Sequence, residues 1–498
     1  MPERPSAPSA VDRPPAGALF VTPVRDFVKE PPVTCPRDAR VTEVARLMSR
    51  RGAGSAVVTD GDGLPVGIVT DRDLRRKVLA EARDPETTSA AQIMSSPVVT
   101  VAPDAFAFEA LLEMTKRDIH HLPLVEGGRL VGVVASDALL FAQTPHPVTL
   151  AREIGRAETV AQLRDAAVRV TGLVRRLVGE GGTAYDVARL VTELNDRLVL
   201  RSLALVTAAL AAEGPERPPG AFCWLAFGSE GRREQTLRTD QDNGLVYADT
   251  AGEDQRAAAF YRRLAERMTD ALVEVGFPPC PGHVMASNPK WCQPLPAWVR
   301  YFEQWMTETT PEHVLAASIF FDLRPLGGEV DLGGRLADLV KETAPKEALF
   351  LRRMAQDVVD DPLPVGLFGR LVAEKKGPRR GSLDLKQGGS RQLVGAGRLH
   401  ALARGLGGTN TVDRFRASAA EGMHTETEIR DIVAAYQHLL RLRLVHQLDQ
   451  LDRGQEVDNH VRLDQLSRAD AVLLRDALRI VAEVQRRVRH RYGTDLLG

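Results

Sequence analysis

Short apolar runs alternate with helical patterns in the first 145 residues, and the same order occurs twice. In the first copy, apolar positions recur at helical spacing over 41–48, and a glycine turn separates apolar runs at 56–58 and 67–70. The order returns about 65 residues later, with the corresponding segments at 106–116, 121–125 and 132–134. Each copy is a βαββα pattern too small to bury a core alone, so we expect the two to pack together.

A long helical stretch separates this repeat from an α/β segment. Apolar positions at spacings of three and four predict two helices within 150–213, broken at Gly181-Gly182. A Pro-rich stretch over 213–220 is typical of a linker. Apolar runs then predict three strands, at 223–227, from 240 to 247 and at 317–323.

From residue 348 onward the pattern is mostly helical, with one Gly-rich interruption over 381–392. Helices expected over 426–451 and 468–491 should form a bundle. The fold class is therefore multidomain α/β plus α. We expect a disordered tail at 1–22, a tandem repeat at 23–145, a helical connector at 150–215, an α/β domain at 220–345 and a helical C-terminal domain at 346–498.

Charge and cysteine content narrow the class of protein. Lys+Arg is 65 against Asp+Glu 66, a balance that argues against a dedicated nucleic-acid binder. No stretch approaches the length of about twenty apolar residues that a membrane span needs. The four cysteines show no disulfide or zinc spacing and favour a reducing, cytoplasmic compartment.

Candidate chemistry is concentrated between residues 222 and 247. Asp240 and Asp242 are two apart on an expected strand, so both carboxylates point to one face. Gly228 and Ser229 form a turn after the preceding strand, where backbone amides can approach a phosphate and a hydroxyl can donate to it. Mg²⁺ takes one or two protein carboxylates plus phosphate oxygens and water, so the pattern predicts a Mg²⁺ (or Mn²⁺) site carrying an NTP.

The string G-S-E-G-R-R-E-Q-T-L-R-T-D-Q-D-N resembles the nucleotidyltransferase motif of the polymerase-β-like superfamily. Its full length is similar to a CBS-linked signal-transduction nucleotidyltransferase family, related to PII-protein uridylyltransferase and glutamine synthetase adenylyltransferase. The resemblance implies a third carboxylate on a later strand. Asp322, the acid at the end of this apolar strand, is the candidate for the third metal ligand and for the general base.

Further nucleotide contacts are expected around this motif. Arg232 and Arg233 can pair with Glu234 or contact phosphates. The related family carries a similar Gly-x-V-M-A-x-N-P-x-W stretch, which suggests that Asn288 bonds a base or sugar, whereas Trp291 is expected to pack. The segment D-L-K-Q-G-G-S-R resembles one in the helical domain of the modifying enzymes, which makes Lys386 and Arg391 candidate triphosphate ligands; Ser390 stands where those relatives carry an apolar residue.

The repeat at 23–145 resembles a tandem pair of CBS domains, a Bateman module. In that family a G-h-h-T-x-x-D segment binds adenine nucleotides through the ribose, and here it supplies Thr70 and Asp73. The second copy departs from the pattern, because Ala135 and Ala138 occupy the two positions. We expect one complete ribose site with an adenine-nucleotide effector; a purely structural or dimerising module is the alternative.

These features predict a signalling nucleotidyltransferase that transfers NMP from NTP to an acceptor hydroxyl. By resemblance alone the acceptor is a protein, and the chain forms a homodimer. Two alternatives stay open: a small-molecule nucleotidyltransferase, and a nucleotide sensor built on the same domains without catalysis. The presence of all three candidate acids favours activity.

Overall fold

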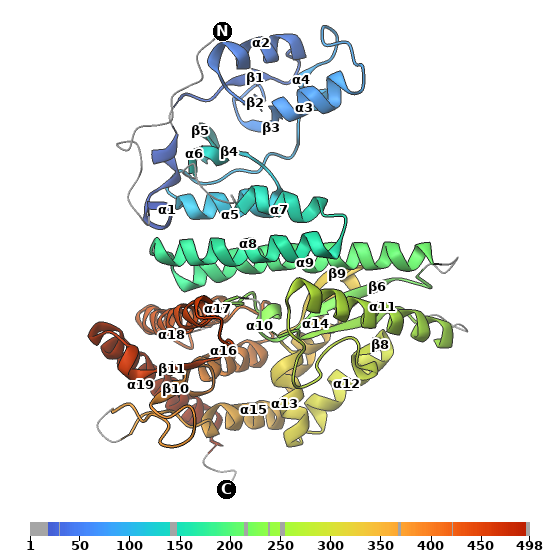
Figure 1. The fold of residues 1–498 in the computed structure, drawn as a ribbon. Coiled ribbons are helices and arrows are strands. Elements are labelled where there is room, and N and C mark those ends of the chain that lie inside the picture. The colour runs from blue at the N-terminus through green and yellow to red at the C-terminus, as the bar shows by residue number, and fades with distance from the viewer. Residues whose placement is uncertain are drawn as a thin grey trace. The chain divides into compact units, whose positions relative to one another are not determined.

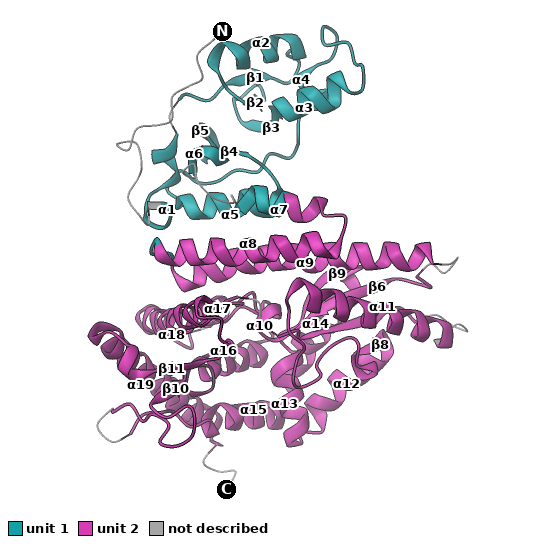
Figure 2. Ribbon diagram, viewed as in Figure 1, with its two compact units in different colours: residues 1–152, 180–182 teal, residues 153–179, 183–498 magenta. Residues whose placement is uncertain are grey.

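The computed structural model describes residues 18–28, 30–139, 147–213, 218–237, 240–249, 254–366, 370–420 and 422–494 (Figure 1). Most of the expected tail and residues 214–217 of the expected linker lie outside them. The chain divides into two compact units, residues 1–152 with 180–182 and residues 153–179 with 183–498 (Figure 2). The five-part division predicted above is finer than this and stays a prediction.

The first unit contains both copies of the repeat. In the first copy, strands β1 (Thr34–Pro36), β2 (Ser55–Thr59) and β3 (Pro65–Thr70) form one sheet, with β1 parallel and β3 antiparallel to β2. Helix α2 (Val41–Arg51) buries Val41, Val44 and Met48. The second copy pairs β4 (His121–Glu126) with β5 (Arg129–Ala135) and places a single parallel bridge, Val101 to Leu124, where a first strand was expected.

Short helices complete the first unit. They are α1 (Ala18–Val21), α3 (Asp71–Asp73), α4 (Ala90–Ile93), α5 (Ala107–Arg117) and α6 (Ser136–Leu139). Helix α5 buries seven of its eleven residues, because nearly every turn faces either the β4–β5 pair or α1. The expected βαββα order therefore holds in the first copy, and in the second copy a single bridge stands in place of the first strand.

Three helices form the connector: α7 (Pro147–Arg156), α8 (Val160–Gly179) and α9 (Ala184–Ala212). The break between α8 and α9 falls at the predicted Gly181-Gly182. Thr183 caps α9 by accepting a hydrogen bond from the Asp186 amide at 3.1 Å. Helices α8 and α9 pack against each other and against α11 (Asp254–Val275) of the α/β segment.

A four-stranded sheet in the order β8-β7-β6-β9 is the centre of the α/β segment. Strand β6 (Phe222–Ala226) is antiparallel to β7 (Asn243–Tyr247) and to β9 (Arg324–Gly328), while β8 (Cys292–Pro294) runs parallel to β7. The remaining helices of this segment are α10 (Gly228–Gly231), α12 (Leu295–Thr307), α13 (Pro311–Phe320) and α14 (Val330–Thr343).

The strand predicted at 317–323 is wrong: residues 311–320 form α13. Continuous apolarity does not distinguish a buried strand from a buried helix, and here the start signals decide. Thr310 accepts a hydrogen bond from the His313 amide at 3.3 Å, and Pro311 occupies the first helical turn. The true strand, β9, begins at Arg324, two residues beyond Asp322.

The C-terminal part is helical, with one small antiparallel pair of strands. Its elements are α15 (Ala348–Asp360), β10 (Ser382–Asp384), α16 (Arg391–Arg404), α17 (Thr411–Ala420), α18 (Glu426–Asp452), β11 (His460–Arg462) and α19 (Arg468–Tyr492). One contiguous apolar core runs through the sheet, through α12–α14 and through these helices, and includes Trp298, Phe320, Phe350 and Leu439. The sheet and the helical part are therefore not separate globules with separate cores.

Candidate active site

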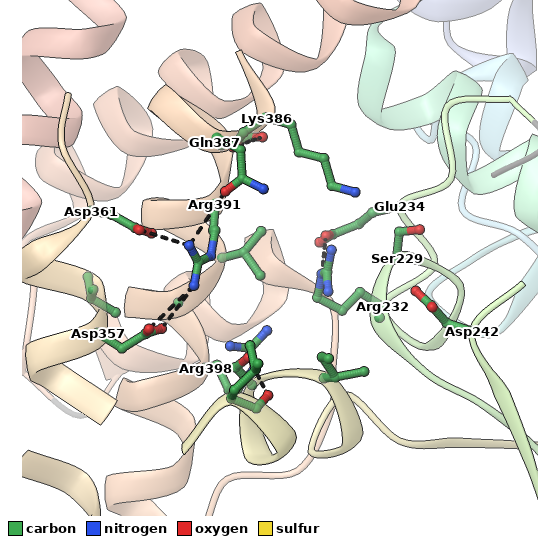
Figure 3. A pocket seen from close by; sticks show the side chains of 18 of the residues that line it. Ser229, Arg232, Glu234, Asp242, Asp357, Asp361, Lys386, Gln387, Arg391 and Arg398 are labelled. Carbon is green, nitrogen blue, oxygen red and sulfur yellow. Dashed lines mark hydrogen bonds and ion pairs between the residues drawn. The ribbon is translucent and has the colours of Figure 1, made fainter. Parts of the chain in front are cut away.

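A cavity of about 420 Å³ lies between the sheet edge and the C-terminal helices. Residues of α10 and of the segment before β7 form one wall, and residues of α15, α16 and α18 form the other (Figure 3). Among its lining residues are Gly228, Ser229, Arg232, Asp242, Lys386 and Arg391, six of the residues that the sequence nominated. Side chains more than 150 positions apart in the chain thus share one site.

The Gly-Ser turn and the second aspartate are in close contact. Gly228 has φ +54°, and a Cβ atom there would lie 2.7 Å from Oδ2 of Asp242. The Phe227 amide donates to the Asp242 carbonyl at 2.9 Å, which fixes the end of β6 beside the start of β7. Only glycine gives both this backbone conformation and room for the carboxylate.

Asp240 and Asp242 lie beside a third donor that the sequence reading did not assign, the thiol of Cys280. One ligand atom from each residue lies within 4.8 Å of the others. Burial, and then the charge of Asp240, raise the pKa of Asp242 to about 6, while Lys386 opposes the shift. Burial, and then the charge of Asp242, raise the pKa of Cys280 to about 11. A cation would relieve the repulsion between the two carboxylates.

Cys280 reaches this position because its loop is bonded to the aspartate segment. The Gln241 amide donates to the Pro278 carbonyl at 2.9 Å, and the Asn243 amide donates to Val284 at 3.0 Å. The same loop carries Asn288, whose side chain accepts from the Lys290 amide and donates to the His283 carbonyl. Asn288 is partly buried and does not line the cavity, so the structure does not place it with the other candidate nucleotide ligands.

Trp291 packs, as expected. It is 7% exposed and lies in an aromatic cluster with Trp298 and Phe320, at centroid distances of 5.9 and 4.3 Å. Its indole nitrogen donates to the His283 carbonyl at 3.1 Å. The cluster supports the sheet face behind the cavity and leaves no ring face for a nucleotide base.

Asp322 was predicted to be the third metal ligand and the general base, and the structure contradicts both roles. Its carboxylate is a buried anion that pairs with arginines. Its carboxylate is fully buried and accepts from Arg232 at 2.6 Å, from Arg398 at 3.0 and 2.6 Å and from Arg414 at 2.6 Å. Burial alone would raise the pKa of Asp322, but these guanidinium groups hold it well below its usual range. Four donors around two oxygens leave no position for a cation, and so low a pKa makes a poor base.

The consecutive residues Arg232 and Arg233 line different cavities. Arg232 lines the cavity and donates to Glu234 at 2.7 Å as well as to Asp322. Arg233 has φ +58°, is exposed and lines a second cavity on the side of Thr409 and Asp413. The structure therefore separates Arg233 from the Gly-Ser turn, and its expected phosphate contact is not supported.

Lys386 and Arg391 both line the cavity, with different surroundings. Arg391 is already paired, with Asp361 at 2.8 Å and Asp357 at 3.3 Å. The Lys386 side chain extends toward Glu234 and Ser229 (Figure 3). A cavity residue that the sequence did not indicate is Arg443 of α18. Its position within a long, mixed helix gave no signal that it faces inward.

The helical part also holds the segment after the Gly228-Ser229 turn in place. Thr409 donates to the Gly231 carbonyl at 2.7 Å, and the Thr411 amide donates to Glu234 at 2.6 Å. Tyr436 donates to the second oxygen of Glu234 at 2.7 Å. Much of the string that follows Gly228 and Ser229 thus serves to attach α10 to α17 and α18.

In the first unit, Thr70 and Asp73 line a cavity of about 780 Å³. Thr70 caps α3, and its hydroxyl donates to Asp73 at 2.7 Å. Asp73 also pairs with Lys77 at 2.8 Å. The two candidate oxygens are together and face a cavity, although in this state they bond to each other.

Three family models match the chain. Residues 24–80 and 90–145 match "CBS domain", residues 168–312 match "Putative nucleotidyltransferase DUF294", and residues 348–492 match "Putative nucleotidyltransferase substrate binding domain". The nucleotidyltransferase match includes most of α8 and all of α9, together with β6, α10 and β7.

Similar proteins share only part of the chain. Uncharacterized protein MK0525 of Methanopyrus kandleri is 35% identical over 113 residues, which are 22% of this chain and 58% of that protein. CBS domain-containing protein CBSCBSPB3 of Arabidopsis thaliana is 27% identical over 187 residues, 37% of this chain and 32% of that protein. The chain thus spans less than two thirds of each of these relatives.

Among solved structures, the CBS domain protein PAE2072 from Pyrobaculum aerophilum, complexed with AMP, is 31% identical at a TM-score of 0.23. The match covers 24% of this chain and 92% of that one. Within the part of the chain that the structure describes, no helix combines the length and apolarity of a membrane span. With a CBS pair, the nucleotidyltransferase model and its substrate-binding model matched in this order, the chain belongs to the CBS-linked nucleotidyltransferase family.

Proposed function

We propose that this protein transfers a nucleoside monophosphate from an NTP to a hydroxyl of a protein acceptor. The bond between the α-phosphorus and its bridging oxygen breaks, the acceptor oxygen bonds to that phosphorus, and pyrophosphate and a proton leave. The observation that carries the proposal is the meeting of Asp240 and Asp242 with the Gly228-Ser229 turn at a cavity that Lys386 also lines. Carboxylates that can hold a metal ion, in a cavity that also presents a lysine to phosphate oxygens, match a metal–triphosphate complex.

The donor set fits a divalent cation. Asp240 and Asp242 would hold it, with the Cys280 thiol adjacent, and the glycine at 228 keeps the space in front of Asp242 free. A bound Mg²⁺ or Mn²⁺ supplies charge neutralisation at the phosphate oxygens. Asp322 is no longer part of this proposal, because its oxygens are occupied by arginines.

The chain's own residues bind and orient the triphosphate. Ser229 presents a hydroxyl beside Asp242, and Lys386 brings an ammonium group into the same space (Figure 3). Arg232, held by Glu234 and Asp322, contributes a fixed positive charge at the cavity wall. Because these groups are positioned before the substrate arrives, little reorganisation is needed when it binds.

The protein acceptor follows from the resemblance to enzymes that modify regulatory proteins. At the cavity, Leu315 of α13 is 54% exposed and lies among the lining residues with Ile319 and Val358. An apolar rim of this kind suits a peptide segment that presents a side-chain hydroxyl. A small-molecule acceptor remains the rival within the enzyme class.

An adenine nucleotide bound at Thr70 and Asp73 is proposed to regulate the transfer. Both residues line the large cavity of the first unit, and a ribose diol could replace the hydrogen bond that they now share. We also propose a homodimer in the cytoplasm; the four cysteines are all free and buried, which fits a reducing compartment.

The test uses purified protein, Mg²⁺ or Mn²⁺ and each α-labelled NTP, with and without host lysate. We expect label on a protein band with the wild type and none with the Asp240→Asn/Asp242→Asn double variant. Label on a small molecule instead would identify the rival acceptor class. Tight NTP binding without transfer, in lysate shown to contain the acceptor of a related enzyme, would establish the sensor alternative.

A further inference from the structure

Two cations at the cavity have no carboxylate partner among the residues that the structure describes. Most charged groups lining it are compensated: Arg391 by Asp357 and Asp361, Arg232 by Glu234 and Asp322, and Arg398 by Asp322. Lys386 and Arg443 also line it, and neither forms an ion pair with any residue that the structure describes. Placing a cation at a protein cavity without an anion is unfavourable unless a ligand supplies one.

Among the described residues, the groups that hydrogen-bond the Arg443 side chain are neutral. Its Nε donates to the side-chain oxygen of Asn459 at 3.0 Å, and a terminal nitrogen donates to the Ser390 hydroxyl at 3.4 Å. Asp384 and Glu234 act on the guanidinium from beyond ion-pair distance. The partly buried side chain therefore has a defined direction and free N–H donors.

Ser390 is the second observation that supports a defined role for Arg443. It is the position at which the chain departs from the apolar residue of the resembled motif. The side chain is 3% exposed, donates to the Leu385 carbonyl at 3.3 Å and accepts from Arg443. An apolar residue at 390 could not accept this hydrogen bond. The serine at this position and the orientation of the Arg443 side chain are therefore linked.

We propose that Arg443 binds the polyphosphate of the NTP, with Ser390 and Asn459 as its positioning residues. The inference rests on the proposed function and adds to it a phosphate ligand from α18, more than 200 residues beyond the Gly-Ser turn. Arginine suits this role because its planar donors match two phosphate oxygens at once. Arg443 and Lys386 line the same cavity as Asp242, which has Asp240 beside it.

The experiment measures binding of NTP and of inorganic tripolyphosphate to the full chain by calorimetry, with Mg²⁺ present. We expect Arg443→Met to weaken both about ten- to a hundredfold, as loss of charge-assisted hydrogen bonds does. Binding of the matching uncharged nucleoside should stay unchanged. Ser390→Val should weaken tripolyphosphate binding by a smaller factor, and Arg443→Lys should restore part of the loss.

Arg441→Met is the matched control. Arg441 lies on the same helix, is 51% exposed and pairs with Asp470 at 2.8 Å on the surface. The inference is overturned if Arg443→Met binds tripolyphosphate like the wild type, or if nucleoside binding falls by the same factor, which would indicate a structural role. A wild type that binds neither NTP nor tripolyphosphate overturns the proposed function together with the inference.

Discussion

The guanidinium of Arg398 donates two hydrogen bonds to the carboxylate of Asp322, at 3.0 Å to Oδ1 and at 2.6 Å to Oδ2. The two residues lie 76 positions apart, one just before β9 and the other on α16. The pair thus joins the sheet to the helical part, and two further arginines also pair with the same carboxylate.

Asp322→Asn should destabilise the protein. Removing the charge leaves Arg398 and Arg414 without their buried anion, while Arg232 keeps Glu234. Breaking a buried pair in this way costs about 3–5 kcal/mol. We expect a large drop in the midpoint of chemical unfolding. Asp413→Asn, at a surface pair with Arg416, is the control and should stay near the wild type. A stable Asp322→Asn protein that binds NTP but transfers nothing would instead restore Asp322 as a catalytic group.

Gly228→Ala should impair metal–nucleotide binding more than it impairs folding. The added methyl group must displace the Asp242 carboxylate, 2.7 Å away, and alanine at φ +54° adds about 1–2 kcal/mol of strain. Titration of NTP with Mn²⁺, followed by the electron paramagnetic resonance of free Mn²⁺, checks this. Gly334→Ala on α14, where nothing lies within 4 Å, should bind normally. Equal binding by both variants would contradict the assigned geometry.

Cys280→Ser should change the metal preference of the site. A thiol beside two carboxylates favours softer ions, whereas oxygen donors suit Mg²⁺. Added Cd²⁺ should produce a sulfur-to-metal absorption band in the wild type and none in Cys280→Ser. Cys292→Ser, at a buried cysteine outside the cluster, should retain the band. A band that persists in Cys280→Ser excludes this thiol as a donor.

Glu230→Gln should flatten the dependence of stability on pH. Burial, and then the charge of Asp196, raise the pKa of Glu230 to about 8 in the folded chain. Because the folded pKa lies above the unfolded value, the stabilisation is complete below the unfolded pKa, near 4.5, and is lost as pH rises through about 8. The loss is about 1.4 kcal/mol for each pH unit between the two pKa values.

Urea unfolding of wild type and Glu230→Gln at pH 5, 7 and 9 measures this effect. The difference in unfolding free energy between the two proteins should shift in favour of Glu230→Gln with increasing pH. A constant difference across these conditions would show that Glu230 titrates normally.

The elements around the motif were predictable because local signals agree there. The Gly-Ser turn follows a fully apolar strand, and Asp242 immediately precedes another, so spacing alone placed both beside a common site. The run at 317–323 misled because its apolar residues fit either a strand or a buried helix. Asp322 was misassigned with it, since its partners Arg398 and Arg414 lie 76 and 92 residues away on helices not yet positioned.

Arg443 and Cys280 were missed for a related reason. A lone arginine in a charged helix and a lone cysteine in a Pro-rich loop look like surface and packing residues. Their roles depend on which distant element covers them, and periodicity does not contain that information. Asn288 is the opposite case. It was assigned to nucleotide binding from a resembled motif, but its side chain hydrogen-bonds within its own loop.

The apolar core shared by the sheet and the C-terminal helices has a consequence for recombination between related genes. A recombination event that joined the sheet of one relative to the helices of another would pair side chains selected against different neighbours. Phe320 and Phe350 would meet foreign packing, and Asp322 would need a foreign set of arginines. We therefore expect natural shuffling to move residues 218–494 as a single block, and hybrids cut near residue 346 to accumulate as insoluble protein.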